Sequence, residues 1–103
     1  MTEAGISVIW SDAAKNDLKS IFDWIIEVSQ SRQAAINVRN DIIKKSKEIV
    51  FAEQYQVEEY LGEPYRRMVV RHFKIIYKIQ NPKEIRILKI FDTHQNPLKL
   101  KDD

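Results

Sequence analysis

Basic side chains gather in one stretch of the chain, YRRMVVRHFKIIYKIQ from Tyr65 to Gln80. Its β-branched and aromatic runs are typical of two neighbouring strands. Arginine binds phosphate or carboxylate through two parallel hydrogen bonds, and lysine acts as a point charge. Such cations on one face of a sheet attract polyanions. We therefore expect a target-binding surface formed by the basic residues of these strands, Arg66, Arg67, Arg71, Lys74 and Lys78.

The turn between the two strands decides which arginine joins the lysines. Side chains alternate between the faces of a strand, so Lys74 and Lys78 share one face. A two-residue turn at residues 71–72 would align Arg67 with both lysines, and a three-residue turn would align Arg66 instead. The sequence leaves both registers open.

Proton-transfer and metal chemistry have few candidate residues. His94 follows the last predicted strand, and a histidine there can act as a general acid or base, although a lone loop histidine is more often solvated. The chain has no cysteine, which excludes disulfides and thiolate metal sites. His72 and His94 are well separated, and neither HExxH nor a Gly-rich phosphate loop is present. We expect no metal and no cofactor.

Length and charge describe one small domain with an uneven surface. At 103 residues, we expect a single domain over residues 1–103. Residues 1–63 carry seven basic and eleven acidic side chains, whereas residues 64–103 carry ten and four. This asymmetry predicts a polarised surface. The N-terminus has no signal pattern, and no apolar run approaches the ~18 residues of a membrane span. We expect a cytoplasmic protein that does not bind membranes.

Hydrophobic spacing predicts two helices between one short strand and three later strands. Apolar residues recur every three or four positions in each helix and in alternation in each strand. The predicted elements are strand 6–10, helices 12–28 and 32–50, an acidic connector 51–64, and strands 66–71, 73–80 and 85–91. The β-α-α-β-β-β order predicts an α+β fold, in which an N-terminal helical hairpin packs on one face of an antiparallel sheet.

The first helix carries more apolar surface than one core face requires. Phe22, Trp24 and Ile26 lie off the centre of its apolar stripe. These three side chains either receive a segment of a partner protein or complete the core or a homodimer contact. Both interpretations remain open at this point.

Three segments together resemble the RelE/ParE superfamily of toxins from bacterial type II toxin–antitoxin modules, also called plasmid stabilisation proteins. The segments are AAKNDLKSIFDWI, GEPYRRMVVRHFKIIYKI and EIRILKIFDTHQNPLKL, in that order, and the likeness covers nearly the whole chain. The family fold agrees with the predicted order of elements.

The resemblance implies one of two activities. RelE-like members are metal-independent endoribonucleases that cut messenger RNA on the translating ribosome, and their functional positions correspond to Arg66, Lys74 and His94 here. ParE-like members inhibit DNA gyrase and lack the nuclease residues. This sequence has Met68 where a second strand lysine is expected, and no Tyr or His follows Pro97. We therefore favour a ParE-like toxin that inhibits growth, with the nuclease and an inactive member that only binds antitoxin as alternatives.

The same resemblance implies a protein partner. A cognate antitoxin, partly disordered alone, folds onto the toxin and neutralises it. The surplus apolar residues of the first helix, Phe22, Trp24 and Ile26, are the predicted antitoxin-binding residues. The expected partners are this antitoxin, in a toxin–antitoxin hetero-oligomer, and either DNA gyrase or the translating ribosome with its messenger RNA.

Overall fold

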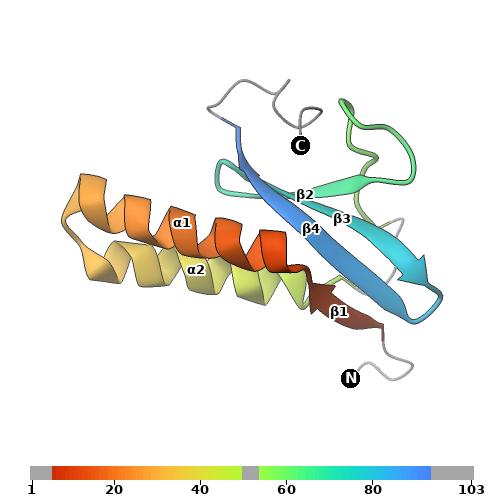
Figure 1. Cartoon of the computed structure of the whole chain (residues 1–103), viewed down its shortest axis with the longest axis horizontal. Coiled ribbons are helices and arrows are strands. Elements are labelled where there is room, and N and C mark those ends of the chain that lie inside the picture. Colours follow the sequence, from red (N-terminus) through yellow and green to blue (C-terminus); the bar gives the residue numbers. More distant parts are fainter. Residues whose placement is uncertain (1–5, 50–53, 94–103) are drawn as a thin grey trace.

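The computed structural model describes residues 6–49 and 54–93, and its elements follow the predicted order (Figure 1). Two helices separate a short first strand from three consecutive strands, which confirms the α+β fold. The elements are β1 (Ser7–Trp10), α1 (Asp12–Ser29), α2 (Arg32–Ser46), β2 (Arg66–Val70), β3 (Phe73–Asn81) and β4 (Glu84–Asp92). No helix in the described part of the chain is both long and apolar enough to cross a membrane.

The four strands form one mixed sheet in the order β1-β4-β3-β2. Short turns join β2, β3 and β4, so these strands form an antiparallel meander. Strand β1 pairs with β4 in parallel, with Ser7 opposite Glu84 and Trp10 opposite Ile87. The prediction of a wholly antiparallel sheet is therefore wrong for this pair. No hairpin joins β1 to its neighbour, since the chain reaches the other strands through two helices.

A serine begins each helix. The hydroxyl of Ser11 accepts the N–H of Ala14 at 3.0 Å, and that of Ser31 accepts the N–H of Ala34 at 3.0 Å. Each serine thereby satisfies a backbone donor that has no partner within its helix. The Ser11 hydroxyl also donates to the carbonyl of Leu88 at 3.1 Å, which ties the start of α1 to β4.

Helix α2 ends earlier than predicted, at Ser46 rather than near residue 50. The N–H of Lys47 is shared between the carbonyls of Ile43 and Lys44, and the chain then turns. This turn carries Ile49 into the core, where its side chain is 2% exposed. Burial of Ile49 therefore favours a turn over another helical residue at this position.

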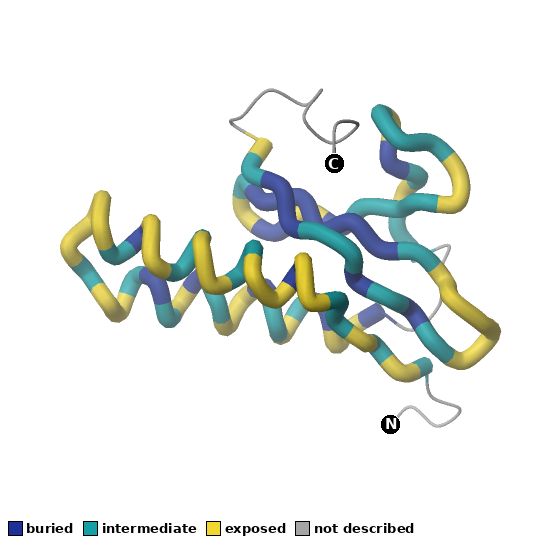
Figure 2. Tube along the Cα trace, viewed as in Figure 1, coloured by how far each residue is buried: buried dark blue, intermediate teal, exposed yellow. Residues whose placement is uncertain are grey.

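The main core lies between the helical hairpin and one face of the sheet. Helix α1 packs on α2 and β4, and α2 also contacts β2. Figure 2 shows the buried parts of the trace running along the middle of β3 and β4. The largest buried sheet residues of this core are Met68, Phe73, Ile75, Tyr77, Ile85, Ile87 and Ile90.

A smaller core lies on the opposite face of the sheet. The chain from Gln54 to Tyr65, which we call the strap, packs Tyr55 on the main core, passes beside the edge strand β2 at Val57, and then covers part of this outer face. Its residues Tyr60, Leu61 and Tyr65 pack on Ile76 and Phe91, which are both buried. Val57 forms an isolated antiparallel bridge with Arg66, and the N–H of Arg67 donates to the carbonyl of Gln56 at 2.9 Å. The part of the predicted acidic connector that the structure describes, residues 54–64, is therefore an ordered segment that packs on the sheet.

Candidate functional site

The turn between β2 and β3 has two residues, which decides the register that the sequence left open. Val70 lies opposite Phe73, and Arg71 in the turn has the left-handed φ of 58°. Val69 lies opposite Lys74, so the outer face carries Lys74 and, two residues before Val69, Arg67. Lys78 shares this face by strand alternation. The predicted group of one arginine and two lysines is therefore present on the outer face.

Arg66 lies on the other face of the sheet. It pairs with Tyr77, whose side chain is fully buried in the main core. Its guanidinium donates to the carbonyl of Tyr55 at 2.8 Å and lies 3.7 Å from the carboxylate of Glu63. The structure therefore does not bring Arg66 and Lys74 together, although the nuclease interpretation requires both at one phosphate.

Lys74 is buried beneath the strap. Its ammonium lies 3.0 Å from a carboxylate oxygen of Glu58, which is itself 0% exposed. The other Glu58 oxygen accepts the N–H of Tyr60 at 2.8 Å. The ring of Tyr60 lies 5.1 Å from the same ammonium, a cation–π distance. Lys74 thus links β3 to the strap, and only 10% of its side chain is exposed.

The other predicted target-binding cations also have partners within the chain. The guanidinium of Arg67 donates to the carbonyl of Val57 and to the side chain of Gln56, both at 2.8 Å. Arg71 donates twice to one carboxylate oxygen of Asp41 on α2, at 3.0 and 2.7 Å. The ammonium of Lys78 lies 5.8 Å from the ring of Tyr65. Most of these partners belong to the strap. Sequence alone does not show them, because the position of the strap on the sheet is a tertiary feature.

The remaining candidates for catalysis are not assembled into a site within the described residues. His94 lies outside the residues that the structure describes. Across residues 6–49 and 54–93, no cluster of three or more His, Cys, Asp or Glu side chains could hold a metal ion.

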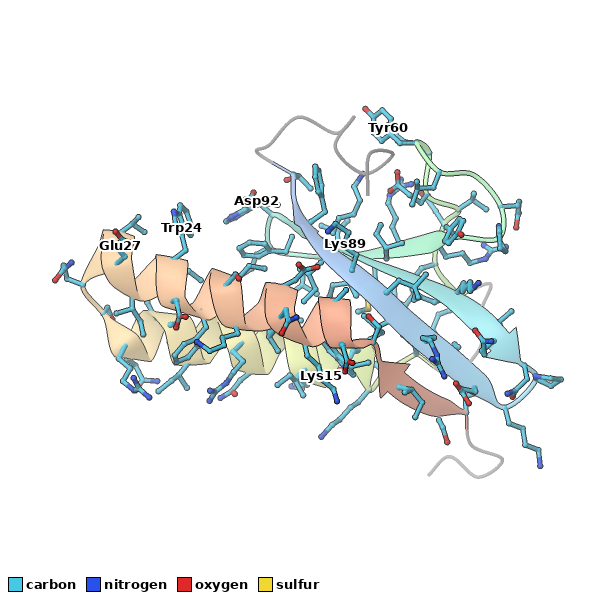
Figure 3. The ribbon with its side chains drawn as sticks, in the orientation of Figure 1. Lys15, Trp24, Glu27, Tyr60, Lys89 and Asp92 are labelled. Atoms are coloured by element: carbon cyan, nitrogen blue, oxygen red, sulfur yellow. The ribbon has the colours of Figure 1, made fainter. Side chains whose placement is uncertain are left out.

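The predicted antitoxin-binding residues lie on different surfaces of α1. Phe22 and Ile26 are both half-buried against the main core, and Phe22 also lines a groove between α1 and α2. Trp24 is 49% exposed and lines a different hollow, with Phe73 and Asp92. Figure 3 shows Trp24 projecting from the side of α1 opposite to Lys15. A single partner segment in the groove would therefore contact Phe22 but not Trp24.

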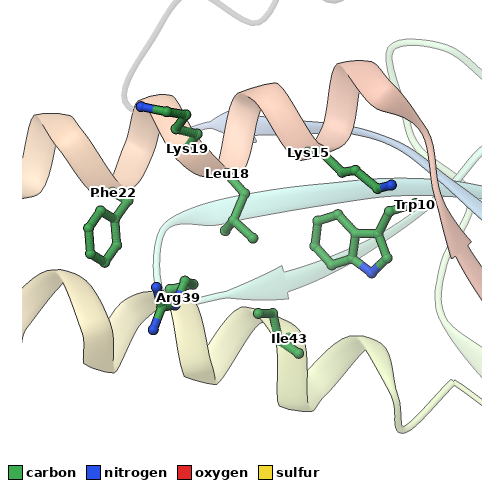
Figure 4. Close-up of a pocket in the computed structure, with 7 residues that line it drawn as sticks. All are labelled: Trp10, Lys15, Leu18, Lys19, Phe22, Arg39 and Ile43. Atoms are coloured by element: carbon green, nitrogen blue, oxygen red, sulfur yellow. The ribbon is translucent and has the colours of Figure 1, made fainter.

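The groove itself was not predicted from the sequence. It has a volume of about 400 Å³, and the close-up in Figure 4 shows α1 on one side and α2 on the other. Its lining residues are Trp10, Lys15, Leu18, Lys19, Phe22, Arg39 and Ile43. Four of them lie in α1, at positions 15, 18, 19 and 22. This spacing places them on one helix face, and it is the feature of the sequence that could have indicated the groove.

Positive charge lies at and beside this groove. The guanidinium carbons of Arg39 and Arg32 lie 5.0 and 5.5 Å from the centre of the Phe22 ring. Lys19 pairs with Asp23 on the exposed surface of α1, at 2.8 Å. In the described part of the chain, no carboxylate pairs with Lys15, Arg32 or Arg39. The groove therefore combines an apolar floor with unneutralised cations.

A helical hairpin on a four-stranded mixed sheet is a fold that this chain shares with a solved toxin–antitoxin protein. That structure is described as a chromosomal ParDE toxin–antitoxin system from P. aeruginosa. The match has a TM-score of 0.70 at 23% sequence identity and covers 84% of this chain and 95% of that chain. At this identity the likeness concerns the fold. None of the curated proteins compared with the chain matches its sequence significantly.

The family to which this chain belongs is shown by a match that covers most of its sequence. A family model described as the ParE toxin of the type II toxin–antitoxin system, parDE, matches residues 8–97. The chain therefore belongs to the ParE toxin family and is the toxin component of a type II toxin–antitoxin module. This confirms the predicted resemblance, on its ParE-like side, and a cognate antitoxin is the partner that such a module provides.

Proposed function

We propose that this toxin acts by binding a protein target, DNA gyrase, and not by cutting RNA. The observation that carries the proposal is the separation of Arg66 and Lys74 on opposite faces of the sheet, each held by an internal partner. A toxin that acts by binding requires a complementary surface but no acid–base pair. The choice of gyrase rests on the ParE-like character of the chain.

The chemistry of RNA cleavage explains why this arrangement favours binding. Attack of a 2′-hydroxyl on phosphate builds up negative charge, which cations aimed at that charge must stabilise. Lys74 directs its ammonium at Glu58, which already neutralises it. Release of Lys74 would leave the Glu58 carboxylate buried without its counterion, which is costly. An RNA phosphate would have to offset that cost before any catalysis began.

We further propose that the toxin works in the bacterial cytoplasm and is stored as a hetero-oligomer with its antitoxin. Direct contact of gyrase with Arg66, Arg67, Arg71, Lys74 and Lys78 remains a prediction from the sequence. Of these, Arg71 is the most exposed, with 48% of its side chain accessible and its ion pair at the surface. Surface ion pairs contribute little and exchange partners readily. We expect Arg71 to be the first of the five that a target reaches.

Supercoiling of relaxed plasmid by purified gyrase tests the proposal. Folded toxin should inhibit supercoiling in proportion to its concentration, and addition of purified antitoxin should restore it. Arg71→Glu should weaken the inhibition, while Lys83→Glu, which changes the same charge in the exposed β3–β4 turn, should not. Uninhibited gyrase in the presence of folded toxin that binds its antitoxin would reject the gyrase proposal.

A further inference from the structure

We propose that the hollow beside Trp24 binds an arginine-bearing segment of the protein that this toxin targets. The hollow lies on the side of α1 that faces away from the groove (Figure 3). The identity of the target as gyrase rests on the function proposed above. The preference for a cationic side chain rests only on the residues of the hollow and of α1. Three features support it: exposed apolar surface, charge on one side of α1, and the end of that helix.

The hollow has apolar walls and an apolar extension along α1. It has a volume of about 520 Å³ and lies where β3 begins at Phe73 and β4 ends at Asp92. Its lining residues are Ser20, Ile21, Trp24, Phe73 and Asp92. Trp24 is 49% exposed, and Val28, one turn further along α1, is 58% exposed. A partner that covers this surface would remove two large apolar side chains from water.

Charge is distributed unequally around α1. At 100° per residue, positions 17, 20, 21, 27 and 28 fall within about 60° of Trp24 around the helix axis. This side carries the acidic residues Asp17 and Glu27 and no lysine or arginine. Lys15 and Lys19 lie on the other side, and Figure 3 shows Lys15 pointing away from Trp24 and Glu27. The Trp24 side of α1 therefore complements a cationic partner.

The two carboxylates on this side of α1 differ in their surroundings. Asp17 accepts the N–H of Ile90 at 2.9 Å and lies 3.9 Å from the ammonium of Lys89. Glu27 is exposed, and no lysine, arginine or histidine forms an ion pair with it in the described part of the chain. Glu27 is therefore the carboxylate that a cationic side chain of a partner can reach.

The end of α1 adds to this preference. The last turn of α1 contains Glu27 and no basic residue, whereas the last turn of α2 carries Lys44 and Lys45. The C-terminal end of a helix carries partial negative charge and attracts cations. The Trp24 ring lies one turn earlier, and a guanidinium stacks favourably on such a ring. An arginine on this ring would have Glu27 beside it and the Asp92 carboxylate in the wall that the sheet provides.

The position of the β2–β3 turn favours the target as the occupant. The ring of His72 lies 4.2 Å from that of Phe73, so the turn adjoins the hollow. The preceding residue, Arg71, is the exposed cation that we expect a target to reach first. A target that covers this end of the sheet would meet a positive group beside a negative hollow. Opposite charges next to each other fix the orientation of a partner.

Two peptides test the charge preference on the full-length toxin. Each has about ten residues, with leucine alternating with Arg in one and with Glu in the other. The toxin has only two tryptophans, so Trp10→Phe leaves Trp24 as the sole reporter. We expect the Arg peptide to change Trp24 fluorescence and to bind at least about fivefold more tightly than the Glu peptide. The formal net charge of the toxin is +2, so non-specific attraction would favour the Glu peptide instead. Equal binding, preference for the Glu peptide, or binding of neither would overturn the proposal.

Charge reversal on α1 localises the preference. In the Trp10→Phe protein, Glu27→Lys should weaken binding of the Arg peptide at least about fivefold. Glu59→Lys makes the same change of net charge at an exposed position of the strap, and we expect it to alter binding less than about twofold. An equal loss in both variants would mean that net charge alone attracts the peptide, which would reject the hollow as its site.

Gyrase inhibition then tests whether the target is the source of the cationic segment. Trp24→Ala should raise the toxin concentration that halves supercoiling at least about tenfold, because exposed tryptophans often dominate binding. Ile79→Ala shortens another apolar side chain, 41% exposed near the β3–β4 turn, and should change inhibition less than about twofold. Antitoxin binding should change equally little in both variants. If Trp24→Ala does not fold, Glu27→Lys provides the same comparison.

Each alternative occupant of the hollow has its own result. Loss of antitoxin binding in Trp24→Ala would assign the hollow to the antitoxin and overturn the proposal. A Trp24 spectrum that changes with toxin concentration, together with the mass of a dimer in light scattering, would assign it to a second copy and also overturn it.

Failure of the proposed function is distinguishable from failure of this inference. If folded wild-type toxin does not inhibit gyrase, selection of the Arg peptide at Trp24 would still support a cationic partner and would reject gyrase as that partner. If the toxin inhibits gyrase and Trp24→Ala inhibits equally well, the hollow is not the target-binding site.

Discussion

The ammonium of Lys74 and the carboxylate of Glu58 form an ion pair at 3.0 Å, with the two side chains 10% and 0% exposed. This pair joins the middle of the sheet to the strap that covers its outer face. Charges removed from water in this way depend on each other, because either one alone would be uncompensated. The pair therefore makes the strap part of the folded domain and withdraws Lys74 from the basic surface that the sequence suggests.

Removal of one member of this pair should destabilise the protein strongly. We expect Glu58→Gln to lower the free energy of unfolding by about 3–5 kcal/mol, because it leaves the Lys74 ammonium buried without a counterion. Urea denaturation followed by circular dichroism measures the change. Glu59→Gln is the matched control, since the neighbouring residue is exposed and should alter stability by less than about 0.5 kcal/mol. Similar small effects from both substitutions would contradict the role of the pair.

Arg66 should contribute to stability through the strap. Arg66→Ala removes the hydrogen bond to the Tyr55 carbonyl, which is worth about 1.5–3 kcal/mol for a charged donor. Thermal or urea unfolding would detect this loss. Growth inhibition, compared at equal amounts of folded protein, then tests the sequence-based prediction that Arg66 also binds the target. Full inhibition by folded Arg66→Ala protein would remove Arg66 from the target-binding site.

Substitutions of Ile75 and Leu18 should differ in effect, because only Ile75 is fully buried. Ile75 is fully buried, so Ile75→Ala should cost about 2–5 kcal/mol and reduce toxicity and antitoxin binding together. Leu18 is half-buried and lines the groove, so Leu18→Ala should cost less stability and weaken antitoxin binding more than gyrase inhibition. Parallel loss of all functions in Leu18→Ala would mean that Leu18 acts only through the core.

The start of α1 should be sensitive to the loss of one hydroxyl. Ser11→Ala removes both the cap on the Ala14 N–H and the bond to the Leu88 carbonyl, and we expect a loss of about 0.5–2 kcal/mol. Ser11→Asp keeps an acceptor for the cap but has no hydroxyl to donate to Leu88. An intermediate unfolding midpoint for Ser11→Asp would show that both bonds contribute. A midpoint for Ser11→Ala equal to that of the unchanged protein would contradict the capping role.

Local periodicity predicted the elements, because each helix and strand shows its own apolar spacing. The position of β1 in the sheet was not predictable in the same way, since β1 pairs with a strand about 75 residues later in the chain. The end of α2 depended on burial of Ile49, which is a tertiary effect. The turn at Arg71 and His72 was one of two open registers, and a positive φ at an arginine is not a strong sequence signal.

The candidate site was less predictable than the fold. Strand alternation placed Lys74 and Lys78 on one face, but it gave no sign that the strap would cover that face. Glu58 appeared as one of several acidic residues in a connector, and only the tertiary structure identifies it as the partner of Lys74. The separation of Phe22 from Trp24 was accessible from the 100° that each helical residue adds, since two residues differ by about 200° around the axis.

The central claim is that the toxin binds a protein and does not cut RNA. The most direct test is a cell-free translation reaction dosed with folded toxin, followed by primer extension on its messenger RNA. We predict intact messenger RNA and undisturbed translation, from toxin shown to bind its antitoxin. New cuts inside codons that appear only while ribosomes translate would contradict the claim, and would require the strap to open and free Lys74 for catalysis.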